Sequence, residues 1–149
     1  MITISEGHEV EFALIGLPDK SGFKTMILIV DDDDLLRNFY SRVLTDEGHE
    51  TVCAADGGEA IGILEGGKHD IGLAIIDLLM PVKTGWELIQ YMKKSRKYKD
   101  VPIIAITAVA ASFDEFEKVR RTCQAVMHKG DFDLSKFKDT VKAQLKNNL

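Results

Sequence analysis

The residues with the clearest chemical potential each follow a short apolar run of the sequence. Asp31 and Asp32 follow the first run, Asp77 follows the third, and Thr107 and Lys129 follow the fourth and fifth. Carboxylates that lie close together raise one another's pKa unless a cation sits between them. Such oxygen ligands, completed by water, suit Mg²⁺ and leave coordination positions open for a phosphate oxygen.

Phosphoryl transfer is the chemistry that this set of residues predicts. Asp77, alone after a central run, is the natural nucleophile, because an aspartate can form an acyl phosphate. Thr107 adds a hydroxyl donor and Lys129 a positive charge for the oxygens of the transferring group. Taken singly, each residue has an ordinary structural explanation as a helix cap, a strand residue or a surface lysine. Their positions after four of the five successive runs favour a shared site.

Five apolar runs have the pattern of strands, and three of them are almost continuously aliphatic, as in a parallel sheet buried on both faces. Amphipathic stretches separate the runs, so the sequence predicts a doubly wound, five-stranded parallel α/β fold with right-handed crossovers. The functional crevice of such a fold lies at the carboxyl ends of its strands. The predicted strands are Met26–Val30, Thr51–Ala55, Ile71–Ile76, Val101–Ile106 and Ala125–Met127.

Apolar side chains recur at helical spacing between these strands. Asp33 or Asp34 is expected to cap the first helix and Gly48 to end it. Ser112 and Glu115 form a capping-box pair ahead of the fourth helix. The apolar stripes run over 36–44, 60–64, 86–92, 113–119 and 134–145.

The composition is that of one globular domain, with 149 residues, 45% of them hydrophobic, and a net charge of −5. The acidic balance argues against direct nucleic-acid binding through a basic face. The longest apolar run, Val101–Ala111, contains Pro102 and is too short for a membrane span, and the N-terminus lacks a signal-peptide pattern. Cys53 and Cys123 form no paired motif, which favours buried thiols in a reducing cytoplasm.

Residues 1–24 do not follow the repeat, and we interpret them as an N-terminal extension to a domain over 25–149. Alternation around Val10 and Phe12 indicates a strand, and a turn before it makes a β-hairpin one interpretation. A pairing element for a second copy and the remnant of another module are the alternatives. Because an exposed strand edge favours pairing, this segment is where self-association is expected if it occurs.

The chain resembles the receiver domain of two-component response regulators, in the single-domain form typified by chemotaxis response regulators. The likeness covers Lys24 to about Lys146 and implies a flavodoxin-like sheet with the strand order 2-1-3-4-5. With no further domain expected after Leu149, function is expected to pass through docking to other proteins. The motifs that carry the likeness are Ile27–Asp33, Ile75–Pro81 with Gly85 after it, Ile104–Ala108 and Val126–Lys129.

The resemblance implies a magnesium site and a phosphoacceptor. Asp77 corresponds to the phosphoacceptor, and Asp31 and Asp32 to the acidic pair that holds Mg²⁺, Asp32 more directly and Asp31 partly through water. The backbone carbonyl of Leu79 would complete the metal shell.

The resemblance also implies switching residues and partners. Thr107 corresponds to the switch hydroxyl and Lys129 to the lysine that pairs with the acceptor or its phosphate. The partners implied are a sensor histidine kinase or a phosphotransfer protein and an unidentified downstream target, with no membrane contact. The chain is thus expected to be a cytoplasmic signalling module, catalytic only toward its own Asp77.

The sequence differs from the family pattern at three places, and each difference leads to an expectation about structure or switching. Gly130 stands where the family has proline after a cis peptide, so a trans Lys129–Gly130 bond is expected, since a cis bond without proline costs about 2.5–4 kcal/mol. Val126 replaces an aromatic residue that turns inward on activation, so switching is expected to use Thr107 and the loop after it. The loop Val82–Thr84 lacks the usual Met-Asp pair, which alters the partner-facing surface there.

Two apolar positions bear on the life of the phosphorylated state. Leu79 and Val109 lie two residues beyond Asp77 and Thr107, and neither side chain can orient an attacking water. We therefore hypothesise a long-lived acyl phosphate.

Two other functions are weighed against this one. A small haloacid-dehalogenase-like phosphatase would use the D-x-D spacing within Asp31–Asp33, but it leaves Asp77 and Met80-Pro81 unexplained, and the chain has no room for a cap. A receiver-fold adaptor that is never phosphorylated is the other alternative, for which Gly130 is the argument. A flavodoxin is disfavoured because four aspartates after the first strand repel the phosphate of a flavin.

Overall fold

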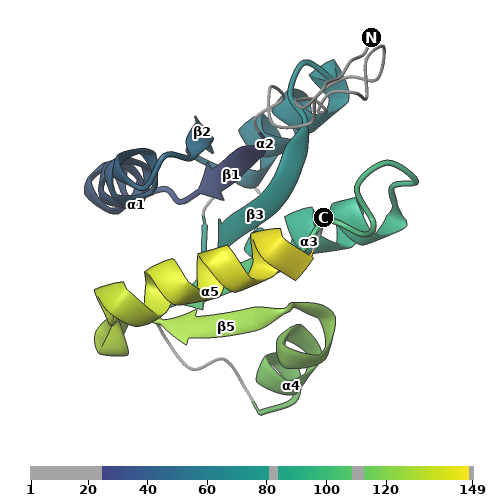
Figure 1. Cartoon of the computed structure of the whole chain (residues 1–149). Coiled ribbons are helices and arrows are strands. Elements are labelled where there is room, and N and C mark those ends of the chain that lie inside the picture. The colour runs from purple at the N-terminus through teal and green to yellow at the C-terminus, as the bar shows by residue number, and fades with distance from the viewer. Residues whose placement is uncertain (1–24, 81–83, 109–112, 148–149) are drawn as a thin grey trace, which may run out of the picture.

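The computed structural model describes residues 25–80, 84–108 and 113–147. Five parallel strands form one sheet in the order β2-β1-β3-β4-β5, which confirms the expected fold class and strand order (Figure 1). The strands are β1 (Met26–Val30), β2 (Glu50–Ala54), β3 (Ile71–Asp77), β4 (Ile103–Thr107) and β5 (Ala125–His128).

Helices cover both faces of the sheet, because successive strand residues point to opposite sides. On one face, Ile27 and Ile29 pack in a core with residues of α1 and α5, whereas on the other Leu28 and Val30 pack with residues of α2, α3 and α4. A short 3₁₀ turn, η3 (Lys129–Asp131), follows β5. The helices are α1 (Asp34–Asp46), α2 (Gly57–Gly66), α3 (Gly85–Lys94), α4 (Phe113–Thr122) and α5 (Leu134–Asn147).

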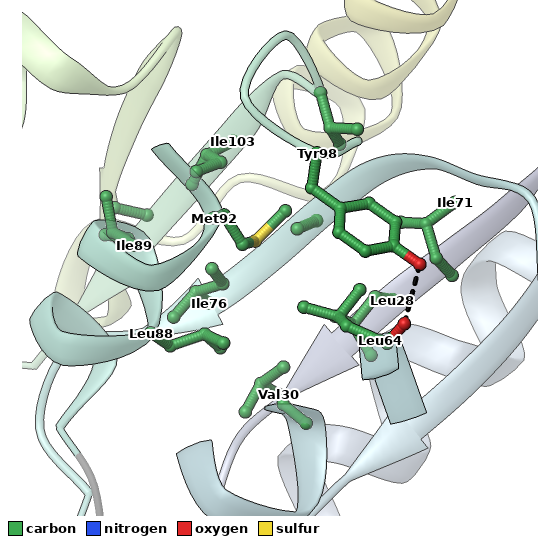
Figure 2. Packing of buried hydrophobic residues seen from close by; sticks show 14 of the residues in the cluster. Leu28, Val30, Leu64, Ile71, Ile76, Leu88, Ile89, Met92, Tyr98 and Ile103 are labelled. Atoms are coloured by element: carbon green, nitrogen blue, oxygen red, sulfur yellow. Dashed lines mark hydrogen bonds between the residues drawn. The ribbon is translucent and has the colours of Figure 1, made fainter. Parts of the chain in front are cut away.

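The core between the sheet and α2–α3 also anchors the loop that follows α3. Figure 2 shows the Tyr98 ring among aliphatic side chains, where its hydroxyl donates to the carbonyl of Leu64 at 2.8 Å. Tyr98 is 5% exposed, so this buried hydroxyl is satisfied by the last turns of α2. The loop leading into β4 is thereby fixed.

Side-chain caps set where three helices begin. Asp33, rather than Asp34, caps α1, and Asp56 caps α2. Thr84 and Glu87 form a reciprocal capping box at α3. These caps fix the direction in which the chain continues after β1, β2 and β3.

Strand boundaries differ from the expected ones by one or two residues. β2 begins one residue earlier than expected, at Glu50, and β4 begins at Ile103 rather than Val101. Pro102 accepts a bond from the N–H of Ala74 at 3.0 Å but has no N–H of its own for the ladder. The hairpin expected in residues 1–24 and the capping residue Ser112 lie outside the described residues.

Candidate functional site

Three carboxylates meet at the carboxyl end of the two central strands. Asp31 directly follows β1, Asp77 is the last residue of β3, and these strands are neighbours in the sheet. One ligand oxygen from each of Asp31, Asp32 and Asp77 lies within 4.8 Å of the other two. Asp31 and Asp77 are 1% and 3% exposed, whereas Asp32 faces solvent. The cluster is therefore buried on one side and open on the other.

The four consecutive aspartates have different contacts. Asp31 Oδ1 accepts a bond from the N–H of Asp33 at 2.9 Å, while Asp33 accepts bonds from the first N–H groups of α1. The Asp34 carboxylate is bound by the guanidinium of Arg37. Within the described residues, only Asp31 and Asp32 of this run join Asp77 in the cluster.

Lys129 brings a positive charge from the edge strand to this cluster. Its Nζ lies 3.1 Å from Asp31 Oδ2 and 3.2 Å from Asp77 Oδ2. The Lys129–Gly130 bond is trans, as expected from the missing proline. The turn η3 thus places the ammonium between the two buried acids without a cis peptide.

Thr107 ends β4 beside the carboxyl end of β3. Ile106 is the register partner of Asp77, and its carbonyl accepts a bond from the N–H of Leu78 at 3.0 Å. Thr107 is 3% exposed and pairs in register with His128 of β5. Four of the expected side chains therefore lie at the ends of β1, β3, β4 and β5, on one edge of the sheet.

Burial sets the electrostatics of the pocket. It raises the pKa of Asp77 to about 6, with the charge of Asp31 adding to the effect and Lys129 opposing it. Burial lowers the pKa of Lys129, but bonding and charge from Asp31 and Asp77 outweigh it, so the net shift is upward. Burial and the charge of Asp31 raise the pKa of Tyr40 to about 12. Burial is therefore the main cause of the raised pKa values of Asp77 and Tyr40, and the charge of Asp31 adds to it in both.

The donor set fits a hard divalent cation. Oδ2 of Asp31 is buried, and among the described residues its partner is the Lys129 ammonium at 3.1 Å, an ion pair without hydrogen-bond geometry. Because this one ammonium is shared with Asp77, it compensates the two buried carboxylates only in part, and a further cation would be favourable. With two further carboxylates at hand and one side open, the oxygen ligands match the chemistry of Mg²⁺.

Leu79 contributes through its backbone. Its N–H donates to Asp77 Oδ1 at 3.2 Å, and its side chain is 55% exposed beside the pocket. Oδ1 and Oδ2 of Asp77 are thus held by different groups, which fixes the plane of the carboxylate. Val82 and Lys83 of the loop before α3, and Val109, which bears on the hypothesis of a long-lived acyl phosphate, lie outside the described residues.

Gly85 holds the backbone that carries Asp77. A Cβ at this position would lie 2.1 Å from the carbonyl oxygen of Asp77 and 2.7 Å from Cα of Leu78. The Gly85 N–H donates to the carbonyl of Leu78 at 3.0 Å, which closes the loop between β3 and α3. Only glycine allows this approach. The sequence identified Gly85 through the family motif alone.

Two residues near the pocket had no assigned function in the sequence analysis. Arg37 donates from Nη1 to the carbonyl oxygen of Asp31 at 2.7 Å. Tyr40 is 2% exposed and packs its ring against Phe132 and Phe137, with ring centroids 5.8 and 5.5 Å apart. Both lie on α1, where helical periodicity alone indicates only which residues face the core.

The sequence matches the response regulator receiver domain over residues 27–142. The chain belongs to this family. Among curated relatives, the polar-differentiation response regulator DivK of Brucella ovis is 28% identical over 120 residues, covering 80% of this chain and 94% of DivK. The expected family is therefore confirmed.

Solved receiver structures resemble the whole described domain. A CheY-like receiver domain protein from Methanospirillum hungatei has a TM-score of 0.74 at 26% identity, covering 84% of this chain and 96% of that one. The response regulator TrrA of Thermotoga maritima has a TM-score of 0.68 at 29% identity, covering 80% and 98%. TrrA was solved in complex with Mg²⁺–BeF.

As a receiver domain, the chain is a signalling module of two-component systems rather than an enzyme of the usual kind. Receiver domains bind Mg²⁺ at an acidic pocket and interact with histidine kinases or phosphotransfer proteins and with downstream targets. Membership of this family decides against the haloacid-dehalogenase-like alternative. In the described parts of the chain, no helix has the length and apolarity needed to cross a membrane.

Proposed function

We propose that Asp77 accepts a phosphoryl group from a sensor histidine kinase or a phosphotransfer protein, in a magnesium-dependent step. The observation that carries this proposal is the setting of the Asp77 carboxylate. It is almost fully buried, lies within 4.8 Å of ligand oxygens of Asp31 and Asp32, and has the Lys129 ammonium 3.2 Å away. A nucleophile, a cation site and a fixed positive charge therefore meet at one point.

The metal ligands in this proposal are the carboxylates of Asp31, Asp32 and Asp77 and the backbone carbonyl of Leu79. When bound, Mg²⁺ supplies positive charge that neutralises phosphoryl oxygens. The residues of the chain do the positioning. The N–H of Leu79 holds Asp77 Oδ1, and Gly85 keeps the β3–α3 loop against the Asp77 backbone.

The transfer itself is a displacement at phosphorus. An oxygen of Asp77 forms the new P–O bond while the P–N bond of the donor's phosphohistidine breaks, and the leaving imidazole nitrogen keeps the electron pair and takes a proton from water. Lys129 stabilises the charge on the equatorial oxygens. Thr107 donates its hydroxyl to one of them, and through Thr107 phosphorylation switches the partner-docking face.

Exposed apolar side chains beside the acidic pocket support docking of a protein donor. Leu35, one residue into α1, is 81% exposed, and Leu79 is 55% exposed. A partner that covers them excludes water from the reacting phosphoryl group. For the downstream target we propose the face around Ala108–Thr122 and β5, where Phe113 is 76% exposed. We also propose that the protein acts in the cytoplasm.

The acyl phosphate is proposed to be long-lived. The side chains at Leu79 and Val109 carry no group able to orient a hydrolytic water. Decay of the phosphorylated protein is compared with that of the Leu79→Asn variant, which we expect to decay several-fold faster. Equal lifetimes would remove the argument.

Incubation of the full chain with acetyl phosphate tests the proposal. With Mg²⁺ we expect one phosphoryl group per chain, located on Asp77 by mass spectrometry, and none with EDTA or in the Asp77→Asn variant. Repeated turnover of acetyl phosphate that Asp31→Asn abolishes and Asp77→Asn does not would indicate a phosphatase instead. No label under any condition, with donor kinases included, would favour the adaptor.

A further inference from the structure

Arg37 is built into the acidic loop differently from the other arginine of α1. Its side chain is 16% exposed, and its guanidinium donates to the carbonyl oxygen of Asp31 at 2.7 Å while also binding the Asp34 carboxylate. Arg42 on the same helix also pairs with an acid, Asp46, at 3.5 Å, but that arginine is 80% exposed. The Arg37–Asp34 and Arg42–Asp46 pairs therefore differ in two ways: Arg37 is far more buried, and it also contacts the backbone of Asp31.

Arg37 contacts the backbone of one ligand-bearing residue, Asp31, and the side chain of Asp34, two residues beyond the other one, Asp32. One arm of its planar fork holds the backbone of Asp31, and the other holds the side chain of Asp34. The N–H of Arg37 also donates to the carbonyl of Asp33 at 2.9 Å. These bonds leave the carboxylate oxygens of Asp31 and Asp32 untouched, and those oxygens form the cluster with Asp77.

We infer that Arg37 is a positioning residue of the magnesium site: it fixes the loop after β1 so that Asp31 and Asp32 face the ion, and it binds Asp34 away from it. This inference rests on the proposed function, since it assumes that the acidic cluster binds Mg²⁺. It assigns each of the four aspartates a distinct position. Asp31 and Asp32 offer ligands, Asp33 caps α1, and Asp34 pairs with the arginine.

The sign of the effect separates positioning from simple electrostatics. A guanidinium close to a cation site repels the cation, so removing its charge would by Coulomb's law alone strengthen Mg²⁺ binding. Loss of a group that orients metal ligands weakens binding instead, by about 10- to 100-fold in known metal sites. The Arg37→Lys variant keeps the charge but loses the two-armed fork, because an ammonium is a single point donor.

Isothermal titration calorimetry of the full chain with Mg²⁺ alone tests the inference without any phosphoryl donor. We expect Arg37→Ala and Arg37→Lys each to raise the dissociation constant about tenfold. Arg42→Ala is the matched control and should stay within about twofold of the wild type, because its pair is exposed. Circular dichroism in EDTA identifies the temperature range in which each variant is folded.

The outcomes distinguish the inference from the function on which it rests. If the wild type binds Mg²⁺ and Asp31→Asn does not, the metal site stands. Unchanged or tighter binding in either Arg37 variant, at a temperature where it is folded, then overturns the positioning role. If the wild type itself binds no Mg²⁺, the proposed metal site fails, whatever Arg37 does.

Discussion

The interior of the sheet and its carboxyl-end edge differ sharply in chemistry. The inner residues of β1, β3 and β4 are aliphatic and almost fully buried, in two cores on opposite faces. Among the described residues, the buried polar or charged ones are Asp31, Asp77 and Thr107, and all three lie at that edge. One residue along a strand thus separates the apolar interior from a costly charged site.

This difference teaches that stability and chemistry are supplied by different parts of the same strands. Burying an aliphatic side chain is worth about 1.5–3 kcal/mol, whereas a buried carboxylate costs free energy unless a cation compensates it. The interior therefore stabilises a fold whose edge is kept short of positive charge. In the proposed function, Mg²⁺ supplies the positive charge that Lys129 alone does not provide.

The largest expected effect comes from the interior. Phe137 of α5 is fully buried, with its ring centroid 5.3 Å from that of Phe132. The Phe137→Ala variant should lose about 3–5 kcal/mol of unfolding free energy in urea, because it leaves a cavity. Its affinity for Mg²⁺, measured where the variant is folded, should change less than twofold. A large loss of affinity would mean that the two regions are not independent.

Gly85 lies where the two regions meet, and its replacement should affect both. The Gly85→Ala variant forces a Cβ against the Asp77 carbonyl, so we expect a loss of roughly 2–3 kcal/mol in urea unfolding and a severe loss of phosphorylation by acetyl phosphate. Gly62→Ala in α2 is the control, because no atom lies within 4 Å of its Cβ position. The unfolding free energy of this control should rise by about 0.5–1 kcal/mol, and its phosphorylation should equal that of the wild type.

Lys129 is the cation that the chain itself supplies to the edge. In EDTA, the unfolding free energy of the Lys129→Met variant should fall by about 1–3 kcal/mol, because Asp31 and Asp77 then share no positive partner. Added Mg²⁺ should restore more stability to this variant than to the wild type. Equal restoration in the two proteins, measured by urea unfolding, would show that the lysine does not compensate the acids.

The Asp77→Asn variant should be more stable than the wild type, and its change in unfolding free energy should be the smallest of the four. The pKa of Asp77 is raised to about 6 in the folded chain by burial and by Asp31, so the folded state binds a proton more tightly than the unfolded state does. Stability from Asp77 is therefore present below pH 4 and lost as the pH rises through about 6. In EDTA, Asp77→Asn should gain on the order of 1–2 kcal/mol over the wild type at pH 8. A gain of equal size at pH 4.5 would contradict this origin.

The strands and their order were predictable because the runs are aliphatic and the family motifs are specific. Asp31, Asp32, Asp77 and Lys129 were identified as candidates by type and by position after a run, and the structure places their charged groups together. Exact strand ends were less predictable. Pro102 is the second residue of an apolar run in the sequence but cannot donate to the ladder, so β4 begins after it.

The rest of the site depends on contacts that periodicity does not encode. Asp33 caps α1 while the adjacent Asp34 pairs with Arg37, and no pattern in the sequence distinguishes the two acids for these contacts. The contact of Arg37 with the Asp31 carbonyl joins a side chain to a backbone atom six residues earlier. The sequence pattern predicts Tyr40 only as a core residue of a helix. The structure shows in addition that it lies near the charges of Asp31 and Lys129.

The position of Lys129 late in the sequence has a consequence for folding during synthesis. The ammonium that lies between Asp31 and Asp77 is carried by the turn after β5, the last strand of the sheet to be synthesised. A growing polypeptide on the ribosome, made from its N-terminus, holds all three acids long before it holds that lysine. The acidic pocket therefore gains its own ammonium only when the final strand joins the sheet, and in the proposed function an unfinished chain holds the acceptor without that positive partner.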